Sequence, residues 1–304
     1  MDFDFLTYLF FGGLTRGSIY ALIALGYTMV YGIVELINFA HGEIYMIGAF
    51  TGLIISSVLT MLGLPILAIV VLSALTAIIY SCAYGYTMEK IAYKPLRDSN
   101  APRLSALISA IGMSLFLQNY VLLAQTSDFL PFPNFIPDFE FWEPYAHILT
   151  SPELVILITT VIVMICLTIL IKFTKIGKAM RATSQDKVMA VLMGVNINRV
   201  ISITFIVGSA TAAIGGILIA CHIGQINFYM GFTAGIKAFV AAVLGGIGSI
   251  PGAVLGSFVL GLTESFFAGY FSSDYEDVFA FLFLVLILIF RPSGILGRAE
   301  TKKV

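Results

Sequence analysis

The sequence predicts an all-α polytopic membrane protein, a bundle of about eight to nine transmembrane helices in one domain over residues 1–304. Hydrophobic residues make up 59% of the chain, charged residues only 11%, and the mean hydropathy is +1.00. Soluble domains carry about 25% charged residues. The 16 Lys and Arg residues gather almost entirely in residues 90–103, 172–199 and 291–303, with long apolar runs between them. Both observations are typical of a chain that crosses a membrane several times.

The apolar runs define the individual helices. A helix needs about 20 apolar residues to cross the hydrocarbon core, and about nine segments approach that length. Gly, Asn and Pro interrupt the runs within residues 1–43 and 222–256, so broken or re-entrant helices are an alternative to clean spans there. In chain order, the predicted segments lie near residues 12–34, 42–62, 65–88, 104–125, 152–172, 199–221, 232–247, 252–270 and 277–290.

The basic clusters give the orientation of these helices. Cytoplasmic loops retain Lys and Arg, which places residues 90–103, residues 173–198 and the carboxyl terminus inside the cell. Residues 126–151 contain no Lys or Arg and are placed outside, as is the acidic turn at residues 274–277. With nine crossings, the amino terminus lies outside. It lacks the basic region and cleavage site of a secretory signal, so the first apolar segment is expected to stay in the mature protein.

The external segment 126–151 is rich in proline, which excludes a regular helix. The single tryptophan, Trp142, lies among acidic residues and suits a membrane interface. The segment is therefore predicted to be a stiff loop resting on the outer leaflet. It is either a connector or, because exposed loops also bind partners, a docking surface. The prolines are Pro131, Pro133, Pro137 and Pro144.

The cytoplasmic loop 173–198 holds the strongest functional signal, a short helix bracketed by Gly177 and Gly194. Short side chains recur there every four residues and are expected to share one helix face, along which another surface can approach closely. The helix is predicted to dock on a partner, and an amphipathic connector lying flat on the membrane is the alternative. The residues assigned to docking are Arg181, Ala182, Asp186, Ala190 and Gly194.

The chain contains no phosphate-binding loop. Lys172 stands where the leading Gly of such a loop would be, and Gly177-Lys178 is followed by Ala179 rather than Ser or Thr. A permease with a docking helix and no motor implies an ATPase on another chain. The net charge of -1 argues against a nucleic-acid partner. The cysteines lie in apolar runs without metal-ligand spacing, so neither a metal site nor a cofactor is predicted.

Polar residues within and beside the apolar runs are the candidates for a translocation path. Asn38, His41 and Glu43 belong to a hexapeptide placed at the inside end of the first span. Asn38 could instead cap the next helix, and the two-residue separation of His41 and Glu43 does not suit a shared metal. Lys237 and Glu264 lie in later apolar runs, where an unpaired charge costs on the order of 3 kcal/mol. They are expected to pair or to face a water-lined cavity, with snorkelling near helix ends as the alternative.

Two sets of small residues at four-residue spacing are expected to let helices pack closely. Such a ridge serves bundle packing more often than a substrate path, and a subunit contact could use the same ridge. The first set is Gly208, Ala212 and Gly216, and the second is Gly248, Gly252 and Gly256.

Motifs spread from the first span to the last match a known family. The most specific are the hexapeptide Asn-Phe-Ala-His-Gly-Glu at 38–43 and the glycine-rich run at 241–252. The chain resembles the LivH-type permease subunits of branched-chain amino acid ABC transporters, a bacterial inner-membrane family. The other matching stretches are residues 17–22, 94–97, 177–199, 237–239 and 291–297.

The resemblance implies a complex in which this chain is not an enzyme. Its partners would be a second permease of similar fold, two cytoplasmic subunits that bind ATP and magnesium, and a soluble protein that delivers the amino acid outside. Residues 177–194 would be the coupling helix. Some other ABC permeases carry Glu-Ala-Ala there, whereas this chain has Arg181-Ala182-Thr183, so their ATPase contacts cannot be transferred. Transport would proceed by alternating access.

Leucine, isoleucine and valine are the substrates that the resemblance implies, and other transport functions are alternatives. Related permeases serve urea, short amides or aromatic acids. An ion-coupled secondary transporter would place several acidic residues or histidines in its spans. In this chain, Lys237 and Glu264 are nearly the only ionisable residues within the later apolar runs. A channel is disfavoured because no ring-forming selectivity sequence is present.

Overall fold

The protein is helical and its helices are long enough to span a membrane, which confirms the predicted fold class. Seven helices within the described residues meet the length and hydropathy of a membrane span. One pair of two-residue strands is the only sheet that these residues form. The computed structural model describes residues 3–99, 101–136, 142–143, 146, 148–291 and 293–297.

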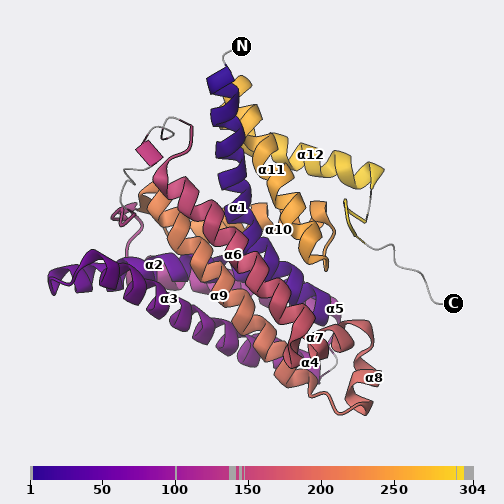
Figure 1. The fold of residues 1–304 in the computed structure, drawn as a ribbon. Helices are drawn as coiled ribbons and strands as arrows, with labels where there is room; N and C mark the ends of the chain where they lie inside the picture. Colours follow the sequence, from indigo (N-terminus) through magenta and orange to yellow (C-terminus); the bar gives the residue numbers. More distant parts are fainter. Residues whose placement is uncertain are drawn as a thin grey trace.

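Helix α1 (Phe3–Val34) is the central element of the bundle, and 83% of the residues in its most apolar 18-residue stretch are buried. Helices α9 (Ile197–Ile223) and α11 (Ile250–Tyr270) pack along it (Figure 1). A Cβ atom added at Gly17 would lie 2.8 Å from the Cα atom of Phe258 in α11. Because a backbone atom cannot rotate away, glycine at this position allows the close approach of the two helices.

The remaining long helices surround this core. Helices α2 (His41–Met61) and α3 (Ile66–Met88) run side by side against α9, and α5 (Arg103–Ala124) and α6 (Ser151–Phe173) complete the bundle (Figure 1). Their outward faces carry exposed apolar side chains, of which Leu123 is 86% exposed. Such apolar faces can contact lipid directly. The helices also satisfy their own backbone hydrogen bonds, as a membrane requires.

Two of the predicted spans form helices that are shorter than a membrane span. Helices α10 (Met230–Gly245) and α12 (Glu276–Phe290) have 16 and 15 residues. At 1.5 Å per residue they reach about 24 and 22 Å, less than the roughly 30 Å hydrocarbon core. All nine predicted segments are therefore helices, seven of them with the length and hydropathy of a membrane span and two of them shorter. The interruptions lie at Gly224 and Gly246, whose φ angles of 75° and 103° favour glycine.

The start of α2 differs most from the predicted layout. The chain turns back after Val34, and His41 lies against Gly26 of α1, with its ring centroid 4.9 Å from that of Tyr27. Gly26 lies eight positions before Val34, so α2 begins about 12 Å inside the bundle from the end of α1. The prediction that the hexapeptide 38–43 lies at the end of the first span is wrong, because the chain re-enters the bundle before α2 begins.

One end of the bundle is called here the α7–α8 end. Arg97 donates to Asn198 Oδ1 at 2.8 Å, and Lys187 Nζ lies 3.5 Å from Glu35 Oε1. These contacts bring the end of α1, the start of α9 and the two loops to the same end. The short elements here are the π-helix η1 (Glu89–Tyr93), α4 (Lys94–Asp98), α7 (Lys175–Gln185) and α8 (Lys187–Leu192).

The opposite end, called here the loop end, carries residues 126–136 and the connection between α9 and α10. Strand β1 (Leu130–Pro131) pairs antiparallel with β2 (Gln225–Ile226), and Phe132 is buried. The described part of the proline-rich loop therefore packs on the protein, which differs from a loop lying on lipid. The 3-10 helix η3 (Ser273–Tyr275) precedes α12. Predictions on Pro137, Pro144, Arg298, Lys302 and Lys303 lie outside the described residues.

Candidate functional site

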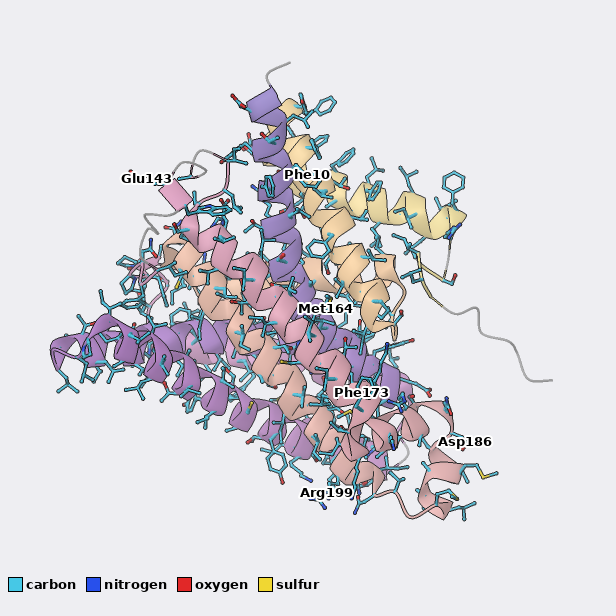
Figure 2. All side chains as sticks on the ribbon, in the orientation of Figure 1. Phe10, Glu143, Met164, Phe173, Asp186 and Arg199 are labelled. Atoms are coloured by element: carbon cyan, nitrogen blue, oxygen red, sulfur yellow. The ribbon has the colours of Figure 1, made fainter. Side chains whose placement is uncertain are left out.

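The segment at the α7–α8 end contains two helices where one was predicted. Thr174 caps α7 by accepting from the Gly177 amide at 3.0 Å. Asp186 has an extended backbone, with φ -155° and ψ 110°, and its carboxylate accepts from the amides of Val188 at 2.8 Å and Met189 at 3.0 Å. The single helix is therefore wrong, because Asp186 caps a second helix instead of continuing the first. Figure 2 shows Asp186 at this junction.

The residues predicted to dock do not share one exposed face. Ala190 is buried, Ala182 is half-buried and Gly194 lies in the turn after α8 with a φ of 83°. Arg181 donates from Nη1 to the carbonyl of Ile171, which ties α7 to the end of α6. Their four-residue spacing does not place them on one helix face, because the helix is interrupted at Asp186.

Helix α8 instead presents an exposed apolar surface. The exposed fraction is 74% for Leu192 and 83% for Met193. Ala190 alone on this helix turns inward, so the large side chains point away from the bundle. An exposed apolar patch at a polar end of a protein marks an interaction site. The α8 apolar surface consists of Val188, Met189, Val191, Leu192 and Met193.

The hexapeptide supplies a polar cluster that is buried inside the bundle. Asn38 Oδ1 accepts from the Tyr93 hydroxyl at 2.7 Å, and α2 has Ala40 at its N-cap without a side-chain cap, so the alternative of an Asn38 cap is wrong. Glu43 is completely buried, and its Oε1 accepts from Ser114 of α5 at 2.9 Å. These contacts join α2 to η1 and α5. The inner polar cluster is defined as Asn38, His41 and Glu43.

The short helix α10 closes over this cluster. A Cβ atom at Gly231 would lie 2.5 Å from Glu43 Oε2, and one at Gly235 would lie 3.0 Å from the Cα atom of Gly42. Glycine lets α10 reach this depth in the bundle. His41 is 2% exposed, and Glu43 Oε2 has no hydrogen-bond partner among the described residues. In this part of the chain, no three His, Cys, Asp or Glu side chains gather as a metal site.

Replacing Ser114 by Ala is expected to destabilise the chain by about 1–3 kcal/mol, because the buried carboxylate of Glu43 loses its donor. Thermal unfolding of the full chain in detergent measures the change, and Ser114→Thr, which keeps the hydroxyl, should restore most of it. Ser57→Ala is the matched control, since exposed Ser57 donates only to a carbonyl of its own helix. Equal unfolding midpoints for Ser114→Ala and Ser57→Ala would contradict the role given to Ser114.

Lys237 and Glu264 lie together, with Lys237 Nζ 3.5 Å from Glu264 Oε1. Glu264 also accepts from the Tyr20 hydroxyl at 2.6 Å, and Lys237 Nζ lies 2.5 Å from Asp277 Oδ1. Arg16 of α1 donates to Glu276 Oε2 of α12 at 2.7 Å. Four helices therefore meet in one network of ion pairs. The outer charged cluster is defined as Arg16, Tyr20, Lys237, Glu264, Glu276 and Asp277.

A third buried carboxylate, Glu89, was missed in the sequence. Its side chain is 0% exposed, and Arg97 Nη2 lies 3.1 Å from Oε1 while Ser202 donates to Oε2 at 3.0 Å. Lys90 lies 3.8 Å away. Glu89 follows an apolar run directly, and that position could have identified it. These contacts join η1 and α4 to the start of α9 at the α7–α8 end.

Two of the residues predicted to pack helices face α1 and α2 from α9. A Cβ atom at Gly208 would lie 3.4 Å from the Cα atom of Gly26, and one at Gly216 would lie 3.1 Å from the carbonyl carbon of Tyr45. Ala212, between them in sequence, is completely buried. Any larger side chain at Gly216 would overlap backbone atoms.

The second predicted ridge is shorter than its spacing indicated. Cβ atoms at Gly252 and Gly256 would each lie 2.5 Å from backbone atoms of Gly245, so both bring α11 against α10. Gly248 has a φ of 91° and lies in the turn before α11. Gly248 therefore adopts the positive φ angle that this turn requires and does not belong to the helix ridge, since α11 begins only at residue 250.

Comparison with known proteins gives a family match along most of the chain. Residues 9–288 match the family described as the permease component of branched-chain amino acid transport systems. The chain is 48% identical over 312 residues to the high-affinity branched-chain amino acid transport system permease protein LivH of Salmonella typhimurium, with 100% of both chains covered. It is 50% identical over 296 residues to the corresponding protein BraD of Pseudomonas aeruginosa, with 96% of both covered.

More distant similarities were also found. The chain is 24% identical over 303 residues to the permease protein LivM of Escherichia coli strain K12, covering 93% of this chain and 68% of that protein. Among solved structures, PsaBC from Streptococcus pneumoniae in complex with Fab aligns with 14% identity and a TM-score of 0.49. That alignment covers 96% of this chain and 94% of the other.

Proposed function

The chain belongs to the family of permease components of branched-chain amino acid transport systems, and from this membership we propose that it carries leucine, isoleucine and valine as a subunit of an ABC importer. The observation that carries the proposal is the 48% identity to LivH over the whole length of both chains. The chain is a transport component of a bacterial inner membrane and has no ATPase domain of its own. ATP and magnesium are bound by partner subunits.

The orientation follows from the charges at the two ends of the bundle. The α7–α8 end carries Lys175, Lys178, Arg181 and Lys187 and faces the cytoplasm, since Lys and Arg stay on that side. The loop end faces outward, and with it the amino terminus. A Cβ atom at Gly32, near the end of α1, would lie 3.7 Å from the Cα atom of Gly248, so the turn after α10 lies at the α7–α8 end. Ile295 donates from its amide to the Leu244 carbonyl at 2.9 Å, which supports a cytoplasmic position for residues 293–297.

Three kinds of protein partner complete the importer. A second permease of related fold is supported by the similarity to LivM, which spans nearly all of this chain. Two ATP-binding subunits lie on the cytoplasmic side, and a soluble binding protein delivers the amino acid outside. Lipid surrounds the exposed apolar faces of the spans, and no nucleic acid takes part.

The α8 apolar surface is the contact through which ATP hydrolysis moves the permease. ATP draws the two ATPase subunits together, α7 and α8 move with them, and the two permeases rock between outward and inward openings. This role rests on the exposure of Leu192 and Met193 and on the rigid attachment of α7 to α6 through Arg181.

Among the alternatives, the family description and its most similar relatives favour branched-chain amino acids over urea or short amides. An ion-coupled carrier is disfavoured by the same membership. Glu43, Glu89 and Glu264 are buried, yet Ser114, Arg97 and Lys237 respectively supply fixed partners, as expected of structural carboxylates. These three carboxylates are therefore not expected to bind and release a coupling ion.

Affinity purification of the tagged chain in mild detergent tests the proposal. The expected result is recovery of ATP-binding subunits and a second permease, with ATPase activity that rises when the loaded binding protein is added. Proteoliposomes of the recovered complex should accumulate leucine only with ATP. Recovery of the chain alone, together with uptake driven by an ion gradient, would contradict the proposal and favour a secondary transporter.

A further inference from the structure

A cavity of about 320 Å³ opens at the loop end between α1, α9 and α10, and Tyr45 of α2 and Asp277 of α12 also line it. Its walls are single helix faces, because the lining residues recur at spacings of three and four positions. Its rim includes Phe129 of the proline-rich loop and Gln225 of β2. The volume lies at the lower end of the range for small-molecule sites. The helix faces are Arg16, Ile19 and Tyr20 of α1, Ile219 and Ile223 of α9, and Met230, Thr233, Ala234 and Lys237 of α10.

The cavity contains charges of both signs at one side. Arg16, Lys237 and Asp277 all line it, and their side chains are 41%, 15% and 59% exposed. Arg16 uses Nη1 for its pair with Glu276, and a guanidinium has five N–H donors, so further donors are available to a ligand. Asp277 lies 2.5 Å from Lys237 through Oδ1. An acidic and a basic group therefore reach the same small space.

The cavity also has apolar lining residues. They include Ile19 of α1, Ile219 and Ile223 of α9, and Met230 of α10. An uncharged polar solute such as urea would leave both the charges and these apolar residues without a matching group. A ligand with one positive group, one negative group and a short aliphatic side chain matches all three parts, and burying such complementary groups together is what gives a small site its specificity.

From this arrangement we infer that the cavity is an outward-facing binding site for a zwitterionic aliphatic α-amino acid. Arg16 binds the carboxylate, Asp277 binds the ammonium group, and the isoleucines of α1 and α9 hold the side chain. Lys237 keeps Asp277 and Glu264 in place through its ion pairs. The inference rests on the proposed function and adds the position and chemistry of the first site within the membrane subunit.

Cysteine protection tests the site directly. In the complete transporter, Cys82, Cys166 and Cys221 are replaced by Ala and a single Thr233→Cys is introduced, since Thr233 is exposed and lines the cavity. A membrane-impermeant methanethiosulfonate reagent is added from outside with or without leucine. Labelling should slow by the factor 1 + [leucine]/Kd, about tenfold at ten times Kd. Ser273→Cys, exposed at the same end but outside the cavity, is the matched control and should not be protected.

Single-charge analogues and two variants identify the groups that bind. 4-Methylpentanoate and 3-methylbutylamine, which each keep one charge of leucine, should protect only at concentrations at least about tenfold higher. Arg16→Gln and Asp277→Asn should raise the half-protecting leucine concentration by a similar factor. Asp274→Asn is the control, because Asp274 is an exposed acid of the same turn that does not line the cavity.

Uptake measured on the same complexes separates this inference from the proposed function. ATP-driven leucine uptake without protection of Thr233→Cys would overturn the site and leave the function standing. Equal protection by leucine and by either analogue would also overturn it, as would unchanged protection in both charge variants, because the outer charged cluster would then only hold α12 in place. Absence of ATP-driven leucine uptake would overturn the proposed function, and the inferred site with it.

Discussion

Replacing Leu192 by Asp is expected to abolish ATP-driven uptake while leaving the chain folded in the membrane. The side chain is 74% exposed, so the variant removes no internal packing. In the complex, however, an apolar contact worth about 2 kcal/mol or more is lost, and a carboxylate would have to be desolvated in its place. Binding of the ATPase subunits should weaken at least about 30-fold. Co-purification of these subunits and leucine uptake are the two measurements.

Two matched variants separate the apolar contact from the added charge. Ser184→Asp places the same charge on exposed α7 without removing an apolar group, and should leave co-purification near normal. Leu192→Met keeps the volume and the apolar character and should preserve uptake. If Leu192→Asp still recovered its ATPase subunits at normal yield, the α8 apolar surface would have to meet the lipid headgroups instead.

The membrane class could be predicted from the sequence because it depends on composition and on runs of apolar residues. Every predicted segment is helical in the structure, and the limits agree closely for α3 and α6. The short length of α10 and α12 could also be predicted, since the apolar segments 232–247 and 277–290 are themselves shorter than a full span. The position of α10 (Met230–Gly245) against α2 could not be predicted, because it depends on contacts with Gly42 and Glu43, which lie far away in the sequence.

The chain re-enters the bundle before α2 because residues 38–43 contact helices that are distant in the sequence. His41 fits against Gly26 and Gly208, which belong to two other helices. Asn38 has a favourable side chain for capping, yet its partner is Tyr93, 55 residues away. Long-range contacts of this kind override local preference, so the position of the hexapeptide inside the bundle cannot be predicted from its local sequence.

The docking segment shows the reverse case, in which a local signal was overlooked. The four-residue spacing predicts Asp186 as one member of a repeating face, although Asp is also a strong N-cap residue. The cap divides the helix and turns Ala190 inward. The apolar residues of α8 are then left outside. Capping preference at Asp186, followed by the apolar run 188–193, would have predicted both the break and the exposed surface.

Replacing Lys237 by Met is expected to lower the free energy of unfolding by about 3 kcal/mol or more, because it leaves buried Glu264 without its cation. Glu264→Leu should cost less, since Lys237 keeps Glu276 at 3.6 Å and Asp277 at 2.5 Å, whereas Glu264 has one cation and the Tyr20 hydroxyl. The asymmetry follows from the number of partners on each side. Denaturant unfolding of the full chain in detergent measures both variants.

The double variant Lys237→Met with Glu264→Leu should be more stable than Lys237→Met alone, because no unpaired carboxylate then remains next to the new apolar side chain. The coupling energy of the cycle should exceed about 1 kcal/mol, while Lys237→Met combined with Ser57→Ala, a distant exposed change on α2, should be additive within about 0.5 kcal/mol. If the changes in unfolding free energy for Lys237→Met and Glu264→Leu were additive, the Tyr20 hydroxyl alone would stabilise the buried carboxylate of Glu264. Lys237 would then serve only the acidic residues of α12.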